Sequence, residues 1–396
     1  MIKSATYTDG ARTVTARVTR VDTWQETTEC VLNFPHVIEL TDNQLFMRVS
    51  RSQHGVPQHE PVYDVYSNNG GQSWQDPPEG MEFGGGIPHG GGALGYLRDN
   101  TIVRMEHHTA EASRRKWDKH AGPFHLVMQE DDPTFQLRHW HADGKAIESV
   151  DFKVAGLPWG TASYQTYATV LDLTNGDLLA AIEAQVGPPT KTGERRADGR
   201  PHWKIDMATS IIRSHDRGKT WGHVTAFRPE DHDLVYGVED RPVDEGFTEA
   251  DLVVASNEDI LCVTRTGSHS PLWQIRSTDG GHTWGTPEPL GWQGVKPRLN
   301  LLPNGVLACA SGRGSYGHPQ VTYVTLSLDG TGQHWEAPFC FHTGPGCSYT
   351  STFIRNNDLH VVYSHSDFTH PLGTHKLPSQ RIRRAVINVG VGTSER

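Results

Sequence analysis

Short apolar segments alternate with polar turns along almost the whole chain. One unit, an apolar strand, a polar turn and a second apolar strand, occurs six times, centred near residues 43, 99, 175, 258, 304 and 357. The copies read VIELTDNQLFMRV, LGYLRDNTIVRM, TVLDLTNGDLLAAI, LVVASNEDILCV, LNLLPNGVLACA and TFIRNNDLHVVY. Short apolar runs bounded by such turns predict β-hairpins. A hairpin repeated at this spacing predicts a radial fold in which each copy supplies the two inner strands of one blade.

A second repeat lies between the hairpins. Its four copies are SNNGGQSW from Ser67, SHDRGKTW from Ser214, STDGGHTW from Ser277 and SLDGTGQHW from Ser327. The Asp or Asn side chain accepts hydrogen bonds from the turn, Gly supplies a positive φ, and Trp packs the turn onto its neighbour. The pattern resembles the Asp-box, or BNR repeat, of sialidases and related β-propellers. The first copy has Asn69 where Asp is usual, and the fourth carries an insertion.

These repeats predict an all-β chain: a single β-propeller over residues 1–396, with six to seven four-stranded blades and Asp-box turns. Residues 130–143 (EDDPTFQLRHWHAD) read as a degenerate box of the second blade, and the intervals 110–165 and 186–248 leave room for a seventh blade. We expect residues 381–391 to close the ring with residues 13–22. The charged stretch 188–202 is expected to be an exposed loop.

Composition narrows the range of partners. The chain has 36 Lys and Arg against 46 Asp and Glu, a net charge of −10, which argues against a general nucleic-acid binder. No apolar run approaches the roughly 20 residues that cross a bilayer. Residues 1–14 lack the apolar core of a signal peptide, so the sequence as written predicts a cytoplasmic protein, or a secreted or periplasmic one if a leader was removed. The oligomeric state stays open.

Five cysteines at irregular spacing do not form a disulfide framework. Cys262 and Cys309 lie in apolar runs and are expected to be buried thiols. Cys340, His342 and Cys347 are weak candidates for a structural metal ion, since their spacing matches no standard zinc motif. No cofactor is required by the chemistry considered below.

Aligning the six hairpins on the apolar residue after each turn reveals ionisable residues at matching places. The anchors are Leu45, Ile102, Leu178, Ile260, Leu307 and Leu359. Five or six residues later stand Arg51, His108, Glu183, Arg265, Arg313 and His365. Equivalent positions in a propeller share one radius and height, so these side chains are expected to ring one mouth of the channel. Arg binds a planar carboxylate with both of its donor groups. Glu249 and Arg265 also fit a simple structural ion pair.

A second set of residues precedes the same anchors by ten or eleven positions or lies next to that position. It comprises His36, Tyr167, Glu249, Lys296 with Arg298, and Tyr349, and His89 stands slightly earlier in its blade within the glycine-rich segment 84–92. The two sets converge on one face. Their cationic surplus predicts an anionic small ligand. The resemblances described next imply that this ligand is an acidic oligosaccharide or polysaccharide.

The chain as a whole resembles the sialidase superfamily. In that family three Arg hold the substrate carboxylate, a Tyr is the nucleophile, a Glu activates it, and an Asp is the acid/base. By motif, Arg265 and Arg313 match the second and third Arg, Glu249 matches the Glu, and Tyr349 matches the Tyr. A carboxylate beside a phenol can take its proton. Asn33-Phe34-Pro35 stands where the family has Arg-Ile-Pro, so the first Arg is missing.

The chain is also similar to propeller polysaccharide lyases of the ulvan-lyase and rhamnose–glucuronate-lyase type. Those enzymes use two His about twenty residues apart, then a Tyr and an Arg. His89 and His108 are nineteen apart and Tyr164 or Tyr167 follows, but the Arg would have to come from Arg213, Arg265 or Arg313. Arg and His neutralise the uronate carboxylate, while Tyr and neutral His suit the base and acid.

Three hypotheses follow. The leading one is a carbohydrate-active lyase that cleaves a uronate-containing glycan by β-elimination, with His108 and Arg265 or Arg313 at the carboxylate. His89 and Tyr167 are its candidates for base and acid, and the sequence does not assign one role to either. The second is a sialidase-like glycoside hydrolase that uses Tyr349 and Glu249. The third is a non-catalytic propeller that binds acidic sugars.

Overall fold

The computed structural model consists of β-strands and turns. It describes residues 3–10, 12–27, 32–41, 43–50, 63–81, 83, 92–108, 133–159, 163–186, 190–195, 201–204, 206–228, 246–267, 270–312, 321–344, 349–366 and 379–393. These residues include no helix, and therefore no helix long and apolar enough to cross a membrane.

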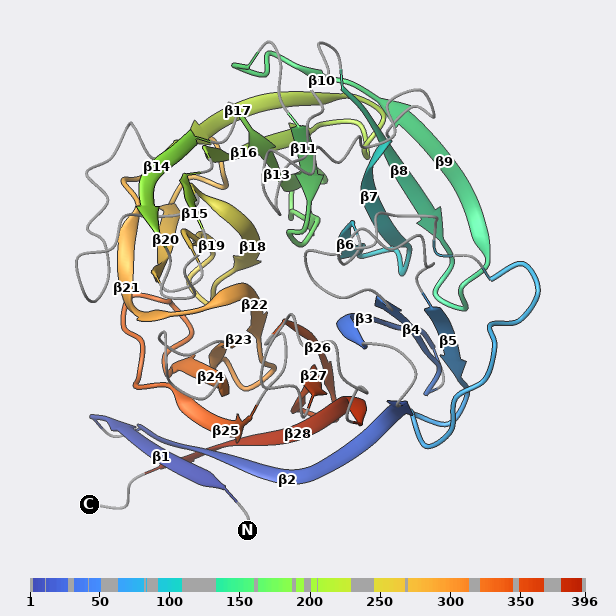
Figure 1. Ribbon diagram of the computed structural model, residues 1–396, viewed down its shortest axis with the longest axis vertical. Coiled ribbons are helices and arrows are strands. Elements are labelled where there is room, and N and C mark those ends of the chain that lie inside the picture. The colour runs from blue at the N-terminus through green and yellow to red at the C-terminus, as the bar shows by residue number, and fades with distance from the viewer. Residues whose placement is uncertain are drawn as a thin grey trace.

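Six sheets, antiparallel except for one short parallel pair of strands in blade 3, are arranged in a ring, and each sheet is one blade (Figure 1). Blade 1 contains β3 (Asn33–Glu39), β4 (Leu45–Ser50) and β5 (Tyr63–Ser67). Blade 2 contains β6 (Ala93–Tyr96), β7 (Ile102–His108), β8 (Thr134–Trp140) and β9 (Ala146–Phe152). Blade 3 contains β10 (Val154–Ala155), β11 (Ser163–Thr166), β12 (Leu171–Asp172), β13 (Leu178–Gln185), β16 (Met207–Ser214) and β17 (Trp221–Phe227).

The strands of the remaining blades are given from the centre of the ring outward. Blade 4 contains β18 (Thr248–Val254), β19 (Ile260–Arg265), β20 (Pro271–Ser277) and β21 (Glu288–Gln293). Blade 5 contains β22 (Val295–Leu301), β23 (Leu307–Gly312), β24 (Val321–Ser327) and β25 (Phe339–Thr343). Blade 6 contains β26 (Thr350–Arg355), β27 (Asp358–Ser366), β28 (Gln380–Thr393), β2 (Arg12–Thr27) and β1 (Ser4–Asp9). The all-β propeller is thus confirmed, with six blades in the described part of the chain.

The sequence analysis expected the stretch 188–202 to be an exposed loop, but the structure places strands there. Within it, β14 (Thr190–Arg195) pairs with β15 (Pro201–Lys204) as a separate two-stranded sheet. The interval between β13 and β16 therefore holds a hairpin attached to blade 3. In the other interval considered for a seventh blade, 110–165, the described residues 133–159 and 163–165 contribute strands to blades 2 and 3, and residues 110–132 and 160–162 lie outside the described residues.

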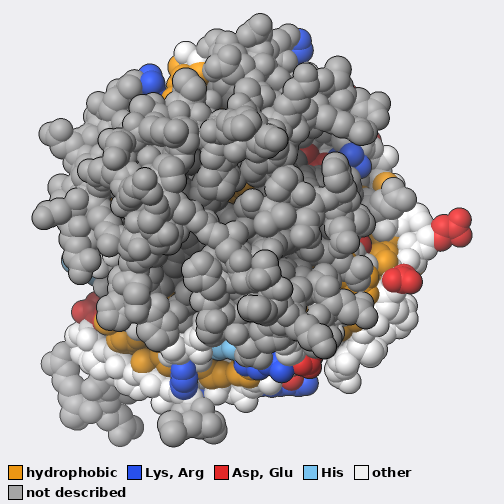
Figure 2. Space-filling model, in the orientation of Figure 1, with side chains coloured by type: hydrophobic (Ala, Val, Ile, Leu, Met, Phe, Trp, Pro, Cys, Tyr) orange, Lys and Arg blue, Asp and Glu red, His pale blue; other side chains and the backbone are white. Residues whose placement is uncertain are grey.

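The ring closes where the expected segments meet. β2 pairs with β28 from Arg12↔Thr393 to Thr27↔Gln380, so the first long strand of the chain lies outside the last one in blade 6. Both described termini lie at this edge (Figure 1). In the same orientation, acidic and basic side chains are interspersed with apolar ones along the lower edge, near β2 and β28 (Figure 2). The excess acidic side chains of the protein are therefore not concentrated along this edge.

The Asp-box turns join the third and fourth strands of their blades. In blade 4, Asp279 accepts hydrogen bonds from the backbone N–H of His282 and Thr283 and from the Ser277 and Thr283 hydroxyls. Trp284 donates to the carbonyl of Gly281. Asn69 accepts from the backbone of Gln72 and Ser73, so an amide oxygen performs the same task in blade 1.

The degenerate box of blade 2 occupies the equivalent place. Its described part is the turn between β8 and β9, where Asp143 accepts from the backbone N–H of Lys145 and Gly144 has φ 86°. Residues 130–132 of the expected segment lie outside the described residues.

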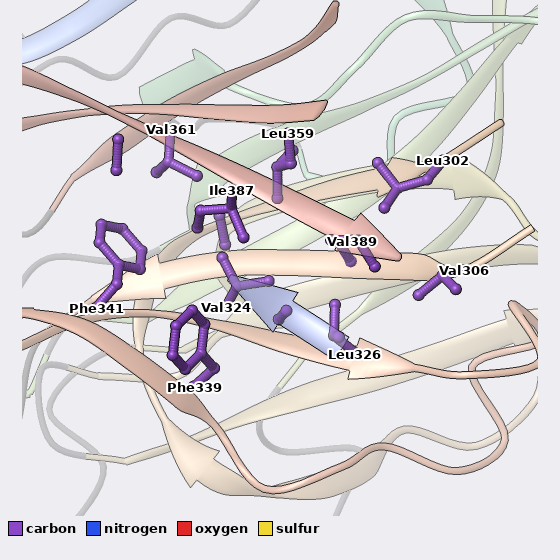
Figure 3. Close-up of a cluster of buried hydrophobic side chains, with 14 of the residues drawn as sticks. Leu302, Val306, Val324, Leu326, Phe339, Phe341, Leu359, Val361, Ile387 and Val389 are labelled. Atoms are coloured by element: carbon purple, nitrogen blue, oxygen red, sulfur yellow. The ribbon is translucent and has the colours of Figure 1, made fainter. Parts of the chain in front are cut away.

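Hydrophobic side chains fill the space between neighbouring blades. The largest cluster lies between blades 5 and 6, where Val324, Phe339 and Phe341 face Val361 and Ile387 (Figure 3). Burying one such side chain contributes about 1.5–3 kcal/mol. Cys262 and Cys309 are fully buried, as expected, and burial raises the pKa of both thiols. Blade-to-blade packing of this kind fixes the inner strands relative to one another.

Candidate functional site

One β-bulge recurs at the start of the inner strand in blades 1, 4 and 5. The pairing register shifts between Asn33 and His36, between Thr248 and Asp251, and between Val295 and Arg298. The residues inside these bulges, Phe34, Glu249 and Lys296, have φ of 52°, 50° and 41°. Residues other than Gly rarely adopt a positive φ, which costs of order 1 kcal/mol. Such bulges are found where they direct a side chain toward a site.

The bulge residues share their position with two tyrosines. Phe34, Tyr167, Glu249, Lys296 and Tyr349 each lie five residues before the partner of the anchor in their own blade, and we call these five residues the inner ring. The corresponding residue of blade 2, Gly91, lies outside the described residues. The inner strands face the centre of the propeller, so equivalent positions converge there (Figure 1).

Four members of the inner ring match the second set of the sequence analysis, and the fifth is a correction. His36 was assigned to this set, but the strand register gives that place to Phe34. The bulge displaces His36 two residues onward, where it lies level with Asp251 and Arg298. His36 is buried, and burial together with the charges of Arg104, Lys296, Arg298 and Arg48 holds the pKa of its imidazole well below the usual value.

The centre of the site is a contact among Tyr349, Glu249 and Arg265. The Tyr349 hydroxyl donates to Glu249 Oε1. Arg265 Nη1 donates to the same carboxylate oxygen at 2.6 Å and to the Tyr349 oxygen at 2.9 Å. Their exposed fractions are 5%, 7% and 5%, respectively for Tyr349, Glu249 and Arg265. Charge-assisted hydrogen bonds between buried groups are short and directional, so the phenol and the carboxylate are held in proton-transfer contact.

Lys296 completes this arrangement from blade 5. Its backbone N–H donates to Glu249 Oε2 at 2.9 Å, so hydrogen bonds reach both carboxylate oxygens. Its Nζ lies 5.7 Å from the ring centroid of Tyr349 and 5.6 Å from that of Tyr167. Cations near an aromatic face are attracted by the ring quadrupole.

Phe34 supplies an apolar wall beside the phenol. Its ring meets Tyr349 edge-on with centroids 4.7 Å apart, and Val295 packs with both residues. Phe34 belongs to the Asn33-Phe34-Pro35 segment that lacks the Arg of the sialidase motif. The described chain therefore presents an aromatic side chain at this point of the site.

Glu183 braces the Glu249 bulge. Its carboxylate accepts from the Thr248 hydroxyl at 2.7 Å and from the Ala250 backbone N–H at 2.9 Å, the two residues that flank Glu249. Glu183 is fully buried, and burial raises the pKa of this carboxyl to about 8, with the Glu249 charge adding to the shift. Glu183 is thus placed to support Glu249 through the backbone.

Arg298 and Asp251 connect three blades behind the inner ring. Arg298 Nη1 lies 3.5 Å from Asp251 Oδ1 and donates to the Tyr167 carbonyl at 3.0 Å. Asp251 also accepts from the backbone N–H of Thr169 and Leu299. Tyr167 itself donates through its hydroxyl to Gln165 at 2.5 Å. These contacts fix Tyr167, Glu249 and Lys296 relative to one another.

The first set of the sequence analysis mixes two strand positions. Glu183 and Arg265 lie five residues after their anchors, whereas Arg51, His108, Arg313 and His365 lie six after theirs. Adjacent strand residues point to opposite faces, so among the described members Glu183 and Arg265 are not at a position equivalent to that of His365. His365 contacts the His342 ring, Nδ1 to Nε2 at 3.1 Å. Arg51, Arg313 and the His108 side chain lie outside the described residues, as does His89.

Arg213 and Tyr164 lie away from the Tyr349 contact. Arg213 pairs with Leu179 near one end of the strand pair and binds Asp177 and the Gly280 carbonyl, while Glu183 stands near the other end. Tyr164 is buried between His107 and Phe135 in the core of blades 2 and 3. Neither residue meets Tyr349, Glu249 or Arg265 in the contacts described.

The described residues include no group of three or more His, Cys, Asp or Glu side chains that could hold a metal ion. Cys340 contacts the carbonyl of His342 and the Thr343 hydroxyl, and Cys347 lies outside the described residues. Burial, with smaller effects of His365 and Arg383, lowers the pKa of His342 to about 4.

Part of the sequence and the overall fold are similar to those of known proteins. Residues 171–361 match the family model of the BNR repeat-like domain. No curated protein matches the sequence. A Dyadobacter fermentans crystal structure of unknown function is similar at 17% identity, with TM-score 0.64 and coverage of 95% of this chain and 99% of that one.

Sialidases share the fold at lower identity. Trypanosoma rangeli sialidase, in complex with the inhibitor DANA, has TM-score 0.54 and 10% identity, over 90% of this chain and 55% of that one. A leech intramolecular trans-sialidase has TM-score 0.54 and 10% identity, over 95% and 70%. This chain therefore spans about half of the Trypanosoma rangeli chain. Residues 171–361 thus match the BNR repeat-like domain, and the chain with its six blades shares the β-propeller fold of these sialidases.

Proposed function

We propose that this protein is a glycoside hydrolase that acts on an anionic sugar, with Tyr349 as nucleophile and Glu249 as the base that activates it. The observation that carries the proposal is the hydrogen bond from the Tyr349 hydroxyl to Glu249, together with the shared donor Arg265. A phenol is a weak nucleophile until a neighbouring base removes its proton. The enzymatic neighbours of this fold, which are sialidases, support the choice of reaction class.

The proposed reaction has two displacement steps. In the first, the Tyr349 proton passes to Glu249, the phenolate oxygen bonds to the anomeric carbon, and the glycosidic C–O bond breaks. The departing aglycone oxygen takes a proton from water. In the second step, a water oxygen bonds to the anomeric carbon and releases a proton to solvent. The Tyr349–sugar bond breaks, and Glu249 returns its proton to the phenolate.

Arg265 has two tasks in this scheme. Its Nη1 donates to both the Glu249 carboxylate and the phenol oxygen and so holds them close together, which keeps the proton path short. Its second task is to bind the anionic substituent of the sugar, because a planar guanidinium suits a carboxylate. This second task is what selects an acidic sugar over a neutral one.

Phe34 favours a substrate that differs from the usual sialoside. The aromatic edge against Tyr349 offers dispersion contact and no charge at the place of the missing Arg. We therefore infer a weaker demand for a carboxylate in the orientation that three Arg would impose. We therefore include smaller acidic sugars, among them uronates, in the proposed substrate class.

β-Elimination remains the competing proposal. It needs His89 and His108, whose side chains lie outside the described residues, while its tyrosine Tyr167 stands on the inner ring. The geometry favours hydrolysis because the described groups already form the nucleophile–base pair that hydrolysis needs. The choice between the two reactions is a matter of product chemistry.

The test is product analysis on a panel of sialosides, glucuronosides, ulvan and rhamnose–glucuronate oligosaccharides. Hydrolysis predicts fragments that carry an added water, without a rise in ultraviolet absorbance. An unsaturated product would replace this proposal with the lyase. A glycosyl fluoride of the cleaved sugar, fluorinated next to the anomeric carbon to slow the second step, should label the peptide that contains Tyr349. Tyr349→Phe should remain unlabelled, and Tyr363→Phe, a buried tyrosine of the same blade, should label normally.

A further inference from the structure

Lys296 is a buried cation and a member of the inner ring. Its exposed fraction is 1%, and its backbone adopts φ 41° at the bulge of β22. Moving an ammonium out of water is expensive, and a strained backbone adds to the cost. Both costs fall on one residue that lies beside Tyr349 and Glu249, the two partners of the proposed proton transfer.

The two ends of Lys296 contact different groups. The backbone N–H donates to Glu249 Oε2 at 2.9 Å and so fixes the carboxylate that accepts the proton. The ammonium lies 5.7 Å from the centre of the Tyr349 ring, which supplies that proton, and 5.6 Å from the centre of the Tyr167 ring. A substitution of the side chain separates the two contacts, because the N–H remains.

The charges around Tyr349 decide which form of the phenol is stabilised. The groups that face the Tyr349–Lys296 contact are Glu249 from β18, Arg265 from β19 and His36 from β3, with Tyr167 following β11. His36 is neutral because its pKa is lowered, and Glu183 behind the bulge is neutral at pH 7 because its pKa is about 8. Among the groups named here, Arg265 and Lys296 are the cations nearest to Tyr349. A phenolate at Tyr349 is therefore attracted by both.

We propose that Lys296 is a positioning residue that acts through Tyr349: its ammonium stabilises the phenolate, and its backbone N–H orients the base that receives the proton. The catalytic meaning of this inference rests on the proposed function. The electrostatic relationship between Lys296 and Tyr349 belongs to the folded protein alone. An opposite charge within a few ångströms of an acid favours its ionised form.

A spectrophotometric titration of tyrosinate tests the electrostatic part. The Tyr349 contribution is the difference between each protein and the same protein carrying Tyr349→Phe. In Lys296→Met the midpoint of this contribution should rise by about one pH unit or more, since one unit corresponds to a tenfold change in the ionisation equilibrium. In Lys296→Arg it should stay within about half a unit. The matched control is Lys145→Met, on a side chain that is 81% exposed in the β8–β9 turn.

A pH–rate profile tests the catalytic part. For Lys296→Met, kcat/KM should fall about tenfold or more at neutral pH and recover as the pH rises, while Lys296→Arg retains most of the rate. An equal loss at every pH, or an unchanged Tyr349 midpoint in a variant with native circular dichroism, would overturn the inference. If the wild-type protein hydrolyses no anionic glycoside, the proposed function fails, and the titration still decides whether Lys296 controls Tyr349.

Discussion

The Tyr349 hydroxyl donates its hydrogen bond to Glu249, although the two residues are 100 positions apart and belong to different blades. The bulge of β18 turns Glu249 toward the axis, and Tyr349 immediately precedes β26. Arg265, on the strand paired with β18, bridges both groups. The arrangement assembles a nucleophile and its base from equivalent positions of two repeats.

Replacement of Tyr349 by Phe should abolish turnover while leaving the fold intact. The substitution removes one oxygen from the Glu249–Arg265 contact, and loss of a nucleophile lowers kcat by roughly 10³-fold or more. The measurement is steady-state hydrolysis of the best substrate in the panel. His108→Ala serves as the comparison: a lyase would lose its activity with that change and tolerate Tyr349→Phe, and such a result would rule out Tyr349 as nucleophile.

Separating Arg265 from Glu249 should destabilise the protein strongly. Both side chains are less than one tenth exposed, and removal of one partner from a buried pair costs about 3–5 kcal/mol. Arg265→Met and Glu249→Gln should each lower the denaturant midpoint, and the double variant should lose less than the two losses added together. Additive losses in this double-mutant cycle would show that the pair is not coupled.

Glu183 should make stability depend on pH. Its folded-state pKa of about 8 lies above the ordinary value of 4.5, so between these values the folded protein holds a proton that the unfolded chain has lost. The free energy of unfolding should therefore decrease as the pH rises from about 5 to about 8, because the unfolded state binds fewer protons. Denaturant melts of wild type and Glu183→Gln across this range check the slope, which the glutamine should reduce. Parallel curves would contradict the assignment.

The Asp-box of blade 4 should tolerate an amide better than an apolar side chain. Asp279→Ala removes the acceptor of His282 and Thr283 N–H, a loss comparable to that of a helix cap, about 1 kcal/mol. Asp279→Asn should cost less, because Asn69 already performs this task in blade 1. Thermal unfolding of the two variants makes the comparison, and equal losses would show that the carboxylate charge, not the acceptor oxygen, matters.

The fold was predictable because its information is local and repeated. Ser-x-Asp-x-Gly turns and alternating apolar strands specify hairpins within a few residues, and their phasing specifies the blades. The pairing of β2 with β28 was also predictable, since both segments show strand patterning at the two ends of the repeat series.

The site was predictable only where the repeat itself carried it. Tyr167, Glu249, Lys296 and Tyr349 were found because each lies ten or eleven residues before its anchor. Phe34 was missed because the alignment sought ionisable residues, and a bulge displaces His36 from the equivalent place. The same search accepted ionisable residues that lie either five or six positions after the anchor. Side chains alternate between the two faces of a strand, so these two positions are not equivalent.

Arg213 and Tyr164 show what a sequence pattern leaves undetermined. Both lie on the expected strands, but one side chain is taken up by Asp177 and the other by aromatic packing with His107 and Phe135. These partners come from separate strands or turns, and the strand pattern alone does not reveal which side chain a given neighbour will engage.

The shared sheet of β2 and β28 also sets an order of events during synthesis. Val14 pairs with Val391, so β2, one of the first two strands to be made, must wait for its partner β28 until the other strands have emerged. Contacts so distant along the sequence form late and slow the last stage of folding. Tyr349 immediately precedes β26 of the same blade, so the proposed contact between Tyr349 and Glu249 is expected to form together with this pairing. The protein would then become active only after β2 has paired with β28. A chain in which only five blades have formed would be inactive.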